Sequence, residues 1–518
     1  MKPLFNAALR FAICASILMF AACDDDSDPG PELTGESKTY DLGPVSDPAI
    51  SGTVTFAERD DDQIVITIEL DGTQSGNSHP AHIHTNSAAE GGGIILDLTP
   101  VDGATGKSET VVSALNDGTA MTYDDFLALN GHVNVHVSST NLPTLIAQGD
   151  IGSNELTGDS KTYTLFPVAD PAVSGGVTFA KRVDGTTLVT IQLDGTQDGA
   201  SHPTHIHENT VAEGGGIVID LTNLDGTTGR SVTSVRAMND GTPITYEELL
   251  DFDGYLNVHT GGTFVVQGDI GQNELTGQSK TYALFPVADP AVSGTVTFAE
   301  RANGNTLVTI QLEGTQDGAV HPTHIHANTV AEGGPIVIDL TNLDGTTGLS
   351  RTNVTQLNDG TAIDYNGLLE FNGYLNVHTG GTFVVQGDIG QNELTGETTE
   401  YALNEVGGSG VSGTATFAKR ANGKAQVTLQ LTGTSAGGDH PAHIHNNDAA
   451  SGGGIAVDLK NVNGETGRSV TSINQLNDGT AITYDELLQF NGHINVHLSP
   501  AQLATLIAQG DVGANGGT

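Results

Sequence analysis

The sequence contains no tryptophan, and its two cysteines, Cys14 and Cys23, both lie near the N-terminus. No disulfide can therefore staple the remainder of the 518-residue chain. Basic residues are also scarce, because 18 Lys and Arg stand against 62 Asp and Glu, for a formal net charge of −44. A field of that sign repels nucleic acid and anionic lipid and attracts cations, which excludes nucleic acid as a partner.

Known catalytic motifs are missing as well. The sequence has no Gly-x-Ser-x-Gly, no His-Glu-x-x-His, no P-loop and no dinucleotide-binding fingerprint. The Gly91-Gly92-Gly93 run precedes a predicted strand rather than a helix, so it is not a phosphate cradle. We predict no catalytic residues, and the sequence leaves open whether the protein is an enzyme.

The N-terminus has the features of a targeting segment. Lys2 and Arg10 precede an apolar stretch, 11–22, that is too short to span a membrane and ends in small residues. Cys23 follows directly, which resembles a bacterial lipobox and implies cleavage before Cys23 and its lipidation. We predict a lipoprotein signal peptide over 1–22 and an acidic tether over 23–31. The alternative is an ordinary signal peptide that happens to contain a cysteine.

The targeting segment also predicts where the protein resides. We expect it to be exported and lipid-anchored to the cell envelope, at the outer membrane or cell surface, with the membrane as its partner through Cys23. An acidic run after a lipidated cysteine resembles a surface-export signal in some bacteria and an inner-membrane retention signal in others. The sequence identifies no extracellular protein partner.

The rest of the chain is one unit repeated four times. Glu-Leu-Thr-Gly recurs at Glu32, Glu155, Glu274 and Glu393, a period of about 120 residues. Such a unit is too long for a solenoid repeat and long enough to fold as a domain. We predict four domains, at 32–154, 155–273, 274–392 and 393–518, joined by short polar segments that allow some bending.

Patterning predicts that each domain is all-β. Apolar and polar residues alternate over 51–58 and 63–70, which indicates a hairpin. Further strands are predicted at 94–98, 133–137 and 145–148, and one helical turn is predicted at 123–129, after Thr122. Seven or eight short strands per copy predict four tandem antiparallel β-sandwich or barrel domains, immunoglobulin-like being one form.

All 18 histidines lie in two segments of each repeat. The first segment, His-Pro-x-His-Ile-His, begins at His79, His202, His321 and His440, and the second, Asn-x-His, ends at His136, His259, His378 and His497. Alternate side chains of a strand share a face, so His82 and His84 lie opposite Ile83, which we assign to the core. If the two strands are neighbours, three imidazoles converge outside the sheet.

Three histidine ligands with an open coordination position suit copper or zinc. The predicted ligands are His82, His84 and His136; His205, His207 and His259; His324, His326 and His378; and His443, His445 and His497. The residues predicted to support them are His79, His202, His321, His440, Asn134, Asn257, Asn376 and Asn495. His132 becomes tyrosine in two copies, so it is not a predicted ligand. The alternative is a structural cluster hydrogen-bonded to backbone or asparagine.

Two other charged positions keep the same offset in every repeat. The first is Asp97, with Asp220, Asp339 and Asp458, which are either turn acids or carboxylates behind the histidines. The second is Arg59, with Arg182, Arg301 and Arg420, which end a hairpin strand and are predicted to lie at the surface.

The order His-x-x-His-Ile-His, Gly-rich turn, apolar strand and Asn-Val-His resembles the CHRD domain, named for its occurrence in chordin. The resemblance covers all four copies, roughly residues 32–513, and implies a β-sandwich or barrel. Bacterial members of the family have no settled activity.

A weaker likeness links the same histidines to copper/zinc superoxide dismutase, whose fold would make the domains dismutase-like. It implies that His82, His84 and His136 bind copper, with His79 behind them. The zinc-loop histidines, the bridging histidine and the disulfide cysteines of that family are missing here. The negative charge would also repel superoxide, which puts dismutase activity in doubt.

Three functions therefore remain open. The first is a surface lipoprotein whose repeats bind copper, zinc or another ligand. The second is a dismutase-like redox enzyme, and the third is a structural or adhesive stalk in which histidine serves only in packing.

Overall fold

The structure, a computed structural model, describes residues 30–516. The predicted signal peptide, Cys23 and all but the last two residues of the predicted tether lie outside the described residues. Within 30–516, none of the helices combines the length and the apolar character that crossing a membrane requires.

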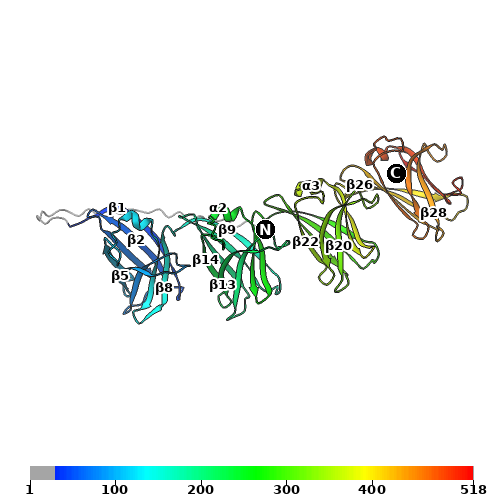
Figure 1. The fold of residues 1–518 in the computed structure, drawn as a ribbon. Coiled ribbons are helices and arrows are strands. Elements are labelled where there is room, and N and C mark those ends of the chain that lie inside the picture. The colour runs from blue at the N-terminus through cyan, green and yellow to red at the C-terminus, as the bar shows by residue number, and fades with distance from the viewer. Residues whose placement is uncertain (1–29, 517–518) are drawn as a thin grey trace. The chain divides into compact units, whose positions relative to one another are not determined.

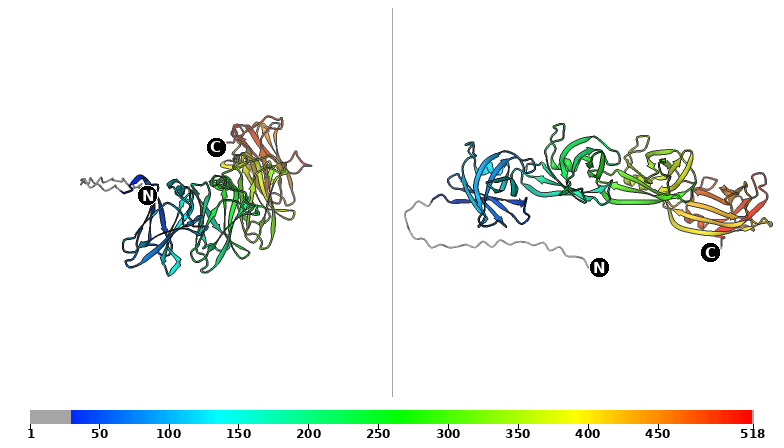
Figure 2. Two further views of the ribbon diagram at one scale, coloured as in Figure 1. Left: turned by 60° about the vertical axis from the view of Figure 1, so that its left-hand side comes forward. Right: turned by 90° about the horizontal axis from the view of Figure 1, so that it is seen from below.

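Each repeat folds into a closed barrel of eight antiparallel strands (Figure 1). The strand order in the first barrel is β1-β2-β3-β6-β5-β4-β7-β8, so three pairings, β3 with β6, β4 with β7 and the closing pair β1 with β8, join strands that are not consecutive. The prediction of four all-β domains is confirmed (Figure 2). Because the sheet of each domain is closed, each domain is a barrel rather than a sandwich.

The elements of the four barrels have closely similar bounds. The first contains β1 (Leu33–Pro44), β2 (Ser51–Arg59), β3 (Ile64–Asp71), β4 (Ser78–Thr85), β5 (Ile94–Asp102), β6 (Lys107–Val112), α1 (Tyr123–Leu127), β7 (Asn130–Ser138) and β8 (Asn141–Gly152). The second contains β9 (Leu156–Pro167), β10 (Ser174–Arg182), β11 (Thr187–Asp194), β12 (Ser201–Glu208), β13 (Ile217–Asp225), β14 (Arg230–Val235), α2 (Tyr246–Leu250), β15 (Asp253–Thr260) and β16 (Thr263–Gly271).

The last two barrels repeat this order. The third contains β17 (Leu275–Pro286), β18 (Ser293–Arg301), β19 (Thr306–Glu313), β20 (Val320–Ala327), β21 (Ile336–Asp344), β22 (Leu349–Val354), α3 (Tyr365–Glu370), β23 (Asn372–Thr379) and β24 (Thr382–Gly390). The fourth contains β25 (Leu394–Glu405), β26 (Ser412–Arg420), β27 (Ala425–Thr432), β28 (Asp439–Asn446), β29 (Ile455–Asn463), β30 (Arg468–Ile473), α4 (Tyr484–Leu488), β31 (Asn491–His497) and β32 (Leu506–Gly513).

The hydrophobic core of each barrel lies inside its wall. In β3 buried side chains alternate with partly exposed ones, which is the period of a strand with one face turned inward. Ile83 of β4 and Val133 of β7 are fully buried in the same core. The predicted hairpin of β2 and β3 forms with Ser51 opposite Asp71, and Thr122 caps α1 in a capping box.

The chain divides into two compact units. Among the described residues, the first unit comprises 30–157 together with 182–184 and contains the first barrel, and the second comprises 158–181 and 185–516.

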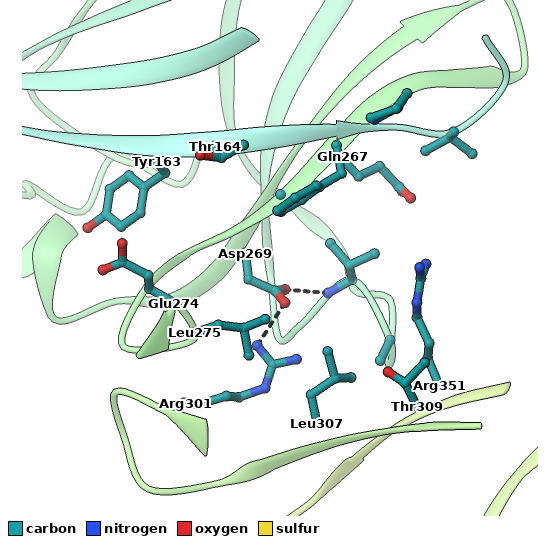
Figure 3. A pocket seen from close by; sticks show the side chains of 16 residues that line it. Tyr163, Thr164, Gln267, Asp269, Glu274, Leu275, Arg301, Leu307, Thr309 and Arg351 are labelled. Carbon is teal, nitrogen blue, oxygen red and sulfur yellow. Dashed lines mark hydrogen bonds and ion pairs between the residues drawn. The ribbon is translucent and has the colours of Figure 1, made fainter. Parts of the chain in front are cut away.

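The four arginines at the end of the second strand correct a prediction. The side chains of Arg182, Arg301 and Arg420 are almost completely buried, and only that of Arg59 keeps some exposure, at 17%. Arg301 Nη1 donates to Asp269 Oδ2 at 2.7 Å (Figure 3) and to the Asn273 carbonyl. The same contacts join Arg420 to Asp388 and Asn392, and Arg182 to Asp150 and Asn154.

The sequence could not reveal this burial because each acid stands 32 residues before its arginine, on the last strand of the preceding repeat. Arg59, in the first repeat, pairs instead with Asp61, two residues away. At each of the three junctions between repeats, an aspartate of the predicted polar joint therefore forms a buried ion pair with an arginine of the following repeat.

Candidate metal centre

The three predicted ligands of each repeat come together on the outer face of two neighbouring strands. β4 pairs with β7, placing His82 opposite Asn134 and His84 opposite His132. Because Ile83 points into the core, His82 and His84 point outward. One nitrogen from each of three imidazoles lies within 4.8 Å of the others in four triads: His82, His84 and His136; His205, His207 and His259; His324, His326 and His378; His443, His445 and His497.

The second ligand of each triad has its tautomer fixed by a backbone carbonyl. His84 Nδ1 lies 3.0 Å from the Gly92 carbonyl oxygen, which can only accept, so Nδ1 carries the hydrogen. The same bond joins His207 to Gly215, His326 to Gly334 and His445 to Gly453. Nε2 of each ring then carries no hydrogen and offers a lone pair, and it is buried without a partner among the described residues.

The Gly-rich loop between β4 and β5 makes this contact possible. Asn86 and Gly91 adopt left-handed backbone conformations, with φ of 63° and 70°. A Cβ on Gly92 would lie 2.1 Å from the Thr85 carbonyl oxygen, so only glycine allows the chain to fold back this closely. The loop thereby brings the Gly92 carbonyl to His84.

The first and third ligands face each other. His82 Nδ1 lies 3.0 Å from His136 Nε2, and His136 Nδ1 donates to the Leu142 carbonyl. His136 Nε2 therefore also carries no hydrogen and offers a lone pair. In the second repeat His205 Nδ1, His207 Nε2 and His259 Nε2 are all buried without a partner among the described residues, and the third repeat is the same. Three imidazole nitrogens thus converge in every barrel.

A carboxylate stands behind the first ligand. Asp97 Oδ1 lies 3.7 Å from His82 Nε2, the ring nitrogen turned away from the triad, although the Asp97 side chain is 70% exposed. Asn116 holds Asp97 in place, because its Nδ2 donates to Asp97 Oδ2 at 3.0 Å and its Oδ1 accepts from the Asp97 backbone at 3.1 Å. Asp220, Asp339 and Asp458 have the same contacts with their histidines and with Asn239, Asn358 and Asn477.

Sequence reasoning missed these asparagines. The available signal was Asn-Asp-Gly-Thr, which occurs at the same offset in all four repeats. It has the residues of a turn, so nothing in the sequence alone connects it with the histidines.

Burial lowers the pKa of the first and third ligands of every triad. For His82 burial is the largest cause, the neighbouring His136 adds to it, and Asp97 acts in the opposite direction. Burial also lowers the pKa of His136, His205, His259, His324, His378, His443 and His497. A lowered pKa keeps the imidazole neutral at neutral pH, the form that coordinates metal.

The residues predicted to support the triad have different positions. His79 lies on the core side of β4, and its Nδ1 donates to the Val137 carbonyl at 2.9 Å. It therefore holds β7, the strand that carries His136, and does not hydrogen-bond to an imidazole of the triad. Asn134 shares the outer face and accepts from Gln148 at 2.8 Å. His132 stacks on His84 with ring centroids 5.0 Å apart, outside the triad.

The fold and the site together define a class: a tandem-repeat β-barrel protein with one histidine triad per barrel. A model of the CHRD domain family matches residues 32–144 and 272–383, within the first repeat and across the third. These two stretches of the chain are therefore CHRD domains. The second and fourth repeats share the strand order and triad of the two matched ones.

Other comparisons add little. No curated protein matches the chain. One solved structure, titled "Biofilm associated protein - BSP domain", is similar over 93% of this chain and 96% of its own, with 10% sequence identity and a TM-score of 0.15. A likeness at that TM-score carries no argument.

Proposed function

We propose that each barrel binds one copper or zinc ion through its histidine triad, in a protein anchored by lipid to the cell envelope. The observation that carries the proposal is the set of converging imidazole nitrogens, buried and unpartnered in the second and third repeats. Buried polar atoms without a partner are costly, and a cation would satisfy all three lone pairs at once.

The alternative of a purely structural cluster fits this arrangement less well. A structural histidine stands apart from other imidazoles, as His79 does: its Nδ1 donates to the Val137 carbonyl, and its Nε2, buried without a partner among the described residues, belongs to no triad. In the triads Nδ1 of the second ligand bonds a carbonyl in every repeat and Nδ1 of the third ligand does so in the first and fourth, while the inward nitrogens of the three rings meet only one another. Asp97 behind His82 completes a carboxylate–histidine–metal arrangement, which orients a ligand and raises its basicity.

The experiment is a metal count on the full chain. The purified protein is loaded with Cu²⁺ or Zn²⁺ at neutral pH, dialysed, and analysed for metal bound per chain. We expect four ions, one for each triad, and one fewer in His82→Ala. Glu109→Gln, an exposed charge change on β6, is the matched control and should keep all four.

Absence of metal above background at neutral pH would overturn the proposal in favour of a structural cluster. A superoxide-consumption assay on the copper-loaded protein then separates a redox enzyme from a binding protein. Membrane partitioning that is lost in Cys23→Ala would support the proposed anchor, and unchanged partitioning would contradict it.

A further inference from the structure

The four triads are of two kinds, which differ first at the third ligand. In the first and fourth repeats Nδ1 of this histidine donates to a backbone carbonyl of the segment that follows, from His136 to Leu142 at 2.5 Å and from His497 to Leu503 at 2.6 Å. In the first repeat the cross-strand partner of this histidine is Leu145, whereas in the second repeat fewer residues intervene and the partner of His259 is Phe264. Its ring lies 4.9 Å from that of His259.

In the third repeat Phe383 is likewise the cross-strand partner of His378, and the centroids of the two rings are 5.0 Å apart. No carbonyl among the described residues accepts from His259 or His378 in the way that Leu142 does. Nothing in the inner repeats therefore fixes which nitrogen of the third ligand carries the hydrogen, whereas the outer repeats present Nε2 as a ready lone pair.

The ring behind the second ligand differs in the same pairs of repeats. His132 stacks on His84 and His493 on His445, with centroids 5.0 and 5.1 Å apart. In the inner repeats Tyr255 and Tyr374 take this place. The Tyr255 hydroxyl accepts from the backbone of Gly215, whose carbonyl accepts from His207, so the inner sites keep the second ligand well fixed.

The asparagine on the ligand face follows the same division. Asn134 and Asn495 accept from Gln148 and Gln509 at 2.8 and 2.7 Å. The side-chain amides of Asn257 and Asn376 are buried without any partner among the described residues. The surroundings of the outer triads are therefore more completely hydrogen-bonded than those of the inner ones.

We infer that the chain carries two classes of metal site, a tighter pair in the first and fourth repeats and a weaker pair in the second and third. The inference rests on the proposed function. Groups that orient a ligand from behind typically change metal affinity about 10- to 100-fold, and the Leu142 and Leu503 carbonyls are such groups for the third ligand. Two pairs of sites would let one chain bind metal over two concentration ranges.

The test is a competitive titration of the full chain with Co²⁺ against a chromophoric chelator, repeated with Zn²⁺. We expect two ions to bind tightly and two about 10- to 100-fold more weakly. A double variant, His136→Ala with His497→Ala, should remove the tight pair and retain the weak one. Its counterpart, His259→Ala with His378→Ala, should do the reverse, and the sites retained in each show that the chain still folds.

A graft provides a gain of affinity that misfolding cannot imitate. Replacing residues 260–264 by the segment 137–145 gives the second repeat the longer segment that carries the Leu142 carbonyl in the first. The replacement should move one ion from the weak class to the tight class. Four equivalent sites, or a division other than outer against inner, would overturn this inference and leave the proposed function standing. No binding at all would overturn both.

Discussion

At the scale of the residue, the face of the strand on which a histidine lies defines the candidate site more than residue identity does. His79 and His84 both lie in one eight-residue strand, and Nδ1 of each donates to a backbone carbonyl while Nε2 of each is buried without a partner among the described residues. His79 lies on the core side of β4 and His84 on the outer side, so only His84 belongs to a triad.

The carboxylate behind the first ligand yields a prediction at this scale. In Asp97→Asn the ring of His82 loses a negative charge 3.7 Å from its Nε2, so we expect metal affinity at the first repeat to fall by about 10-fold, the lower end of the usual range because Asp97 is exposed. Competitive titration measures the change. Glu109→Gln alters the same charge away from the site and should have no effect. An unchanged affinity in Asp97→Asn would show that the carboxylate does not act on the ligand.

At the scale of the element, glycines decide how strands and loops approach one another. The barrel closes through a short pairing of β1 with β8, at Gly43 opposite Gln148 and Pro44 opposite Ala147. The next residue, Gly149, lies under β1, where a Cβ would stand 2.1 Å from the Asp41 carbonyl oxygen. Glycine is required there because the opposing atom is backbone, which cannot rotate away.

Gly149→Ala should therefore weaken the closure of the first barrel. We expect a loss of about 1–3 kcal/mol in the free energy of unfolding, the usual cost of overpacking. Hydrogen exchange should rise along β1 and β8 and remain unchanged in the other barrels. Gly93→Ala is the control, since a Cβ there meets nothing within 4 Å. Equal exchange in the two variants would refute the requirement.

At the scale of the whole molecule, buried ion pairs connect residues of successive repeats. Asp269 accepts from Arg301 and, through its other oxygen, from the Val211 backbone at 2.8 Å (Figure 3). Val211 belongs to the loop that contains Gly215, the partner of His207. A cavity of about 390 Å³ lies beside Asp269 and Arg301, and no triad histidine lines it.

Arg301→Ala should cost far more than an average surface substitution. Removing one partner leaves Asp269 with an uncompensated, mostly buried charge, which typically destabilises by about 3–5 kcal/mol. The matched control is Arg59→Ala, at the same position of the first repeat, where we expect less than about 1 kcal/mol. Chemical unfolding of the full chain measures both, and equal costs would contradict the role of the pair.

The sequence by itself determined the four repeats, the all-β fold and which side chains share a face. These features follow from local patterns: alternation fixes the inward face of β3, and the spacing of His82 and His84 puts both on one side of β4. The sequence also singled out the three histidines of each triad, given neighbouring strands.

Only the tertiary structure decided the rest. The pairing of β4 with β7, the choice of barrel over sandwich and the burial of Arg301 all depend on contacts between residues far apart in the chain. Asn116 lies in a loop and Leu142 at the start of β8, and packing rather than local pattern brings each to its histidine or aspartate. For this reason the histidines could be predicted from the sequence, while the groups that orient them, and the difference between outer and inner repeats, could not.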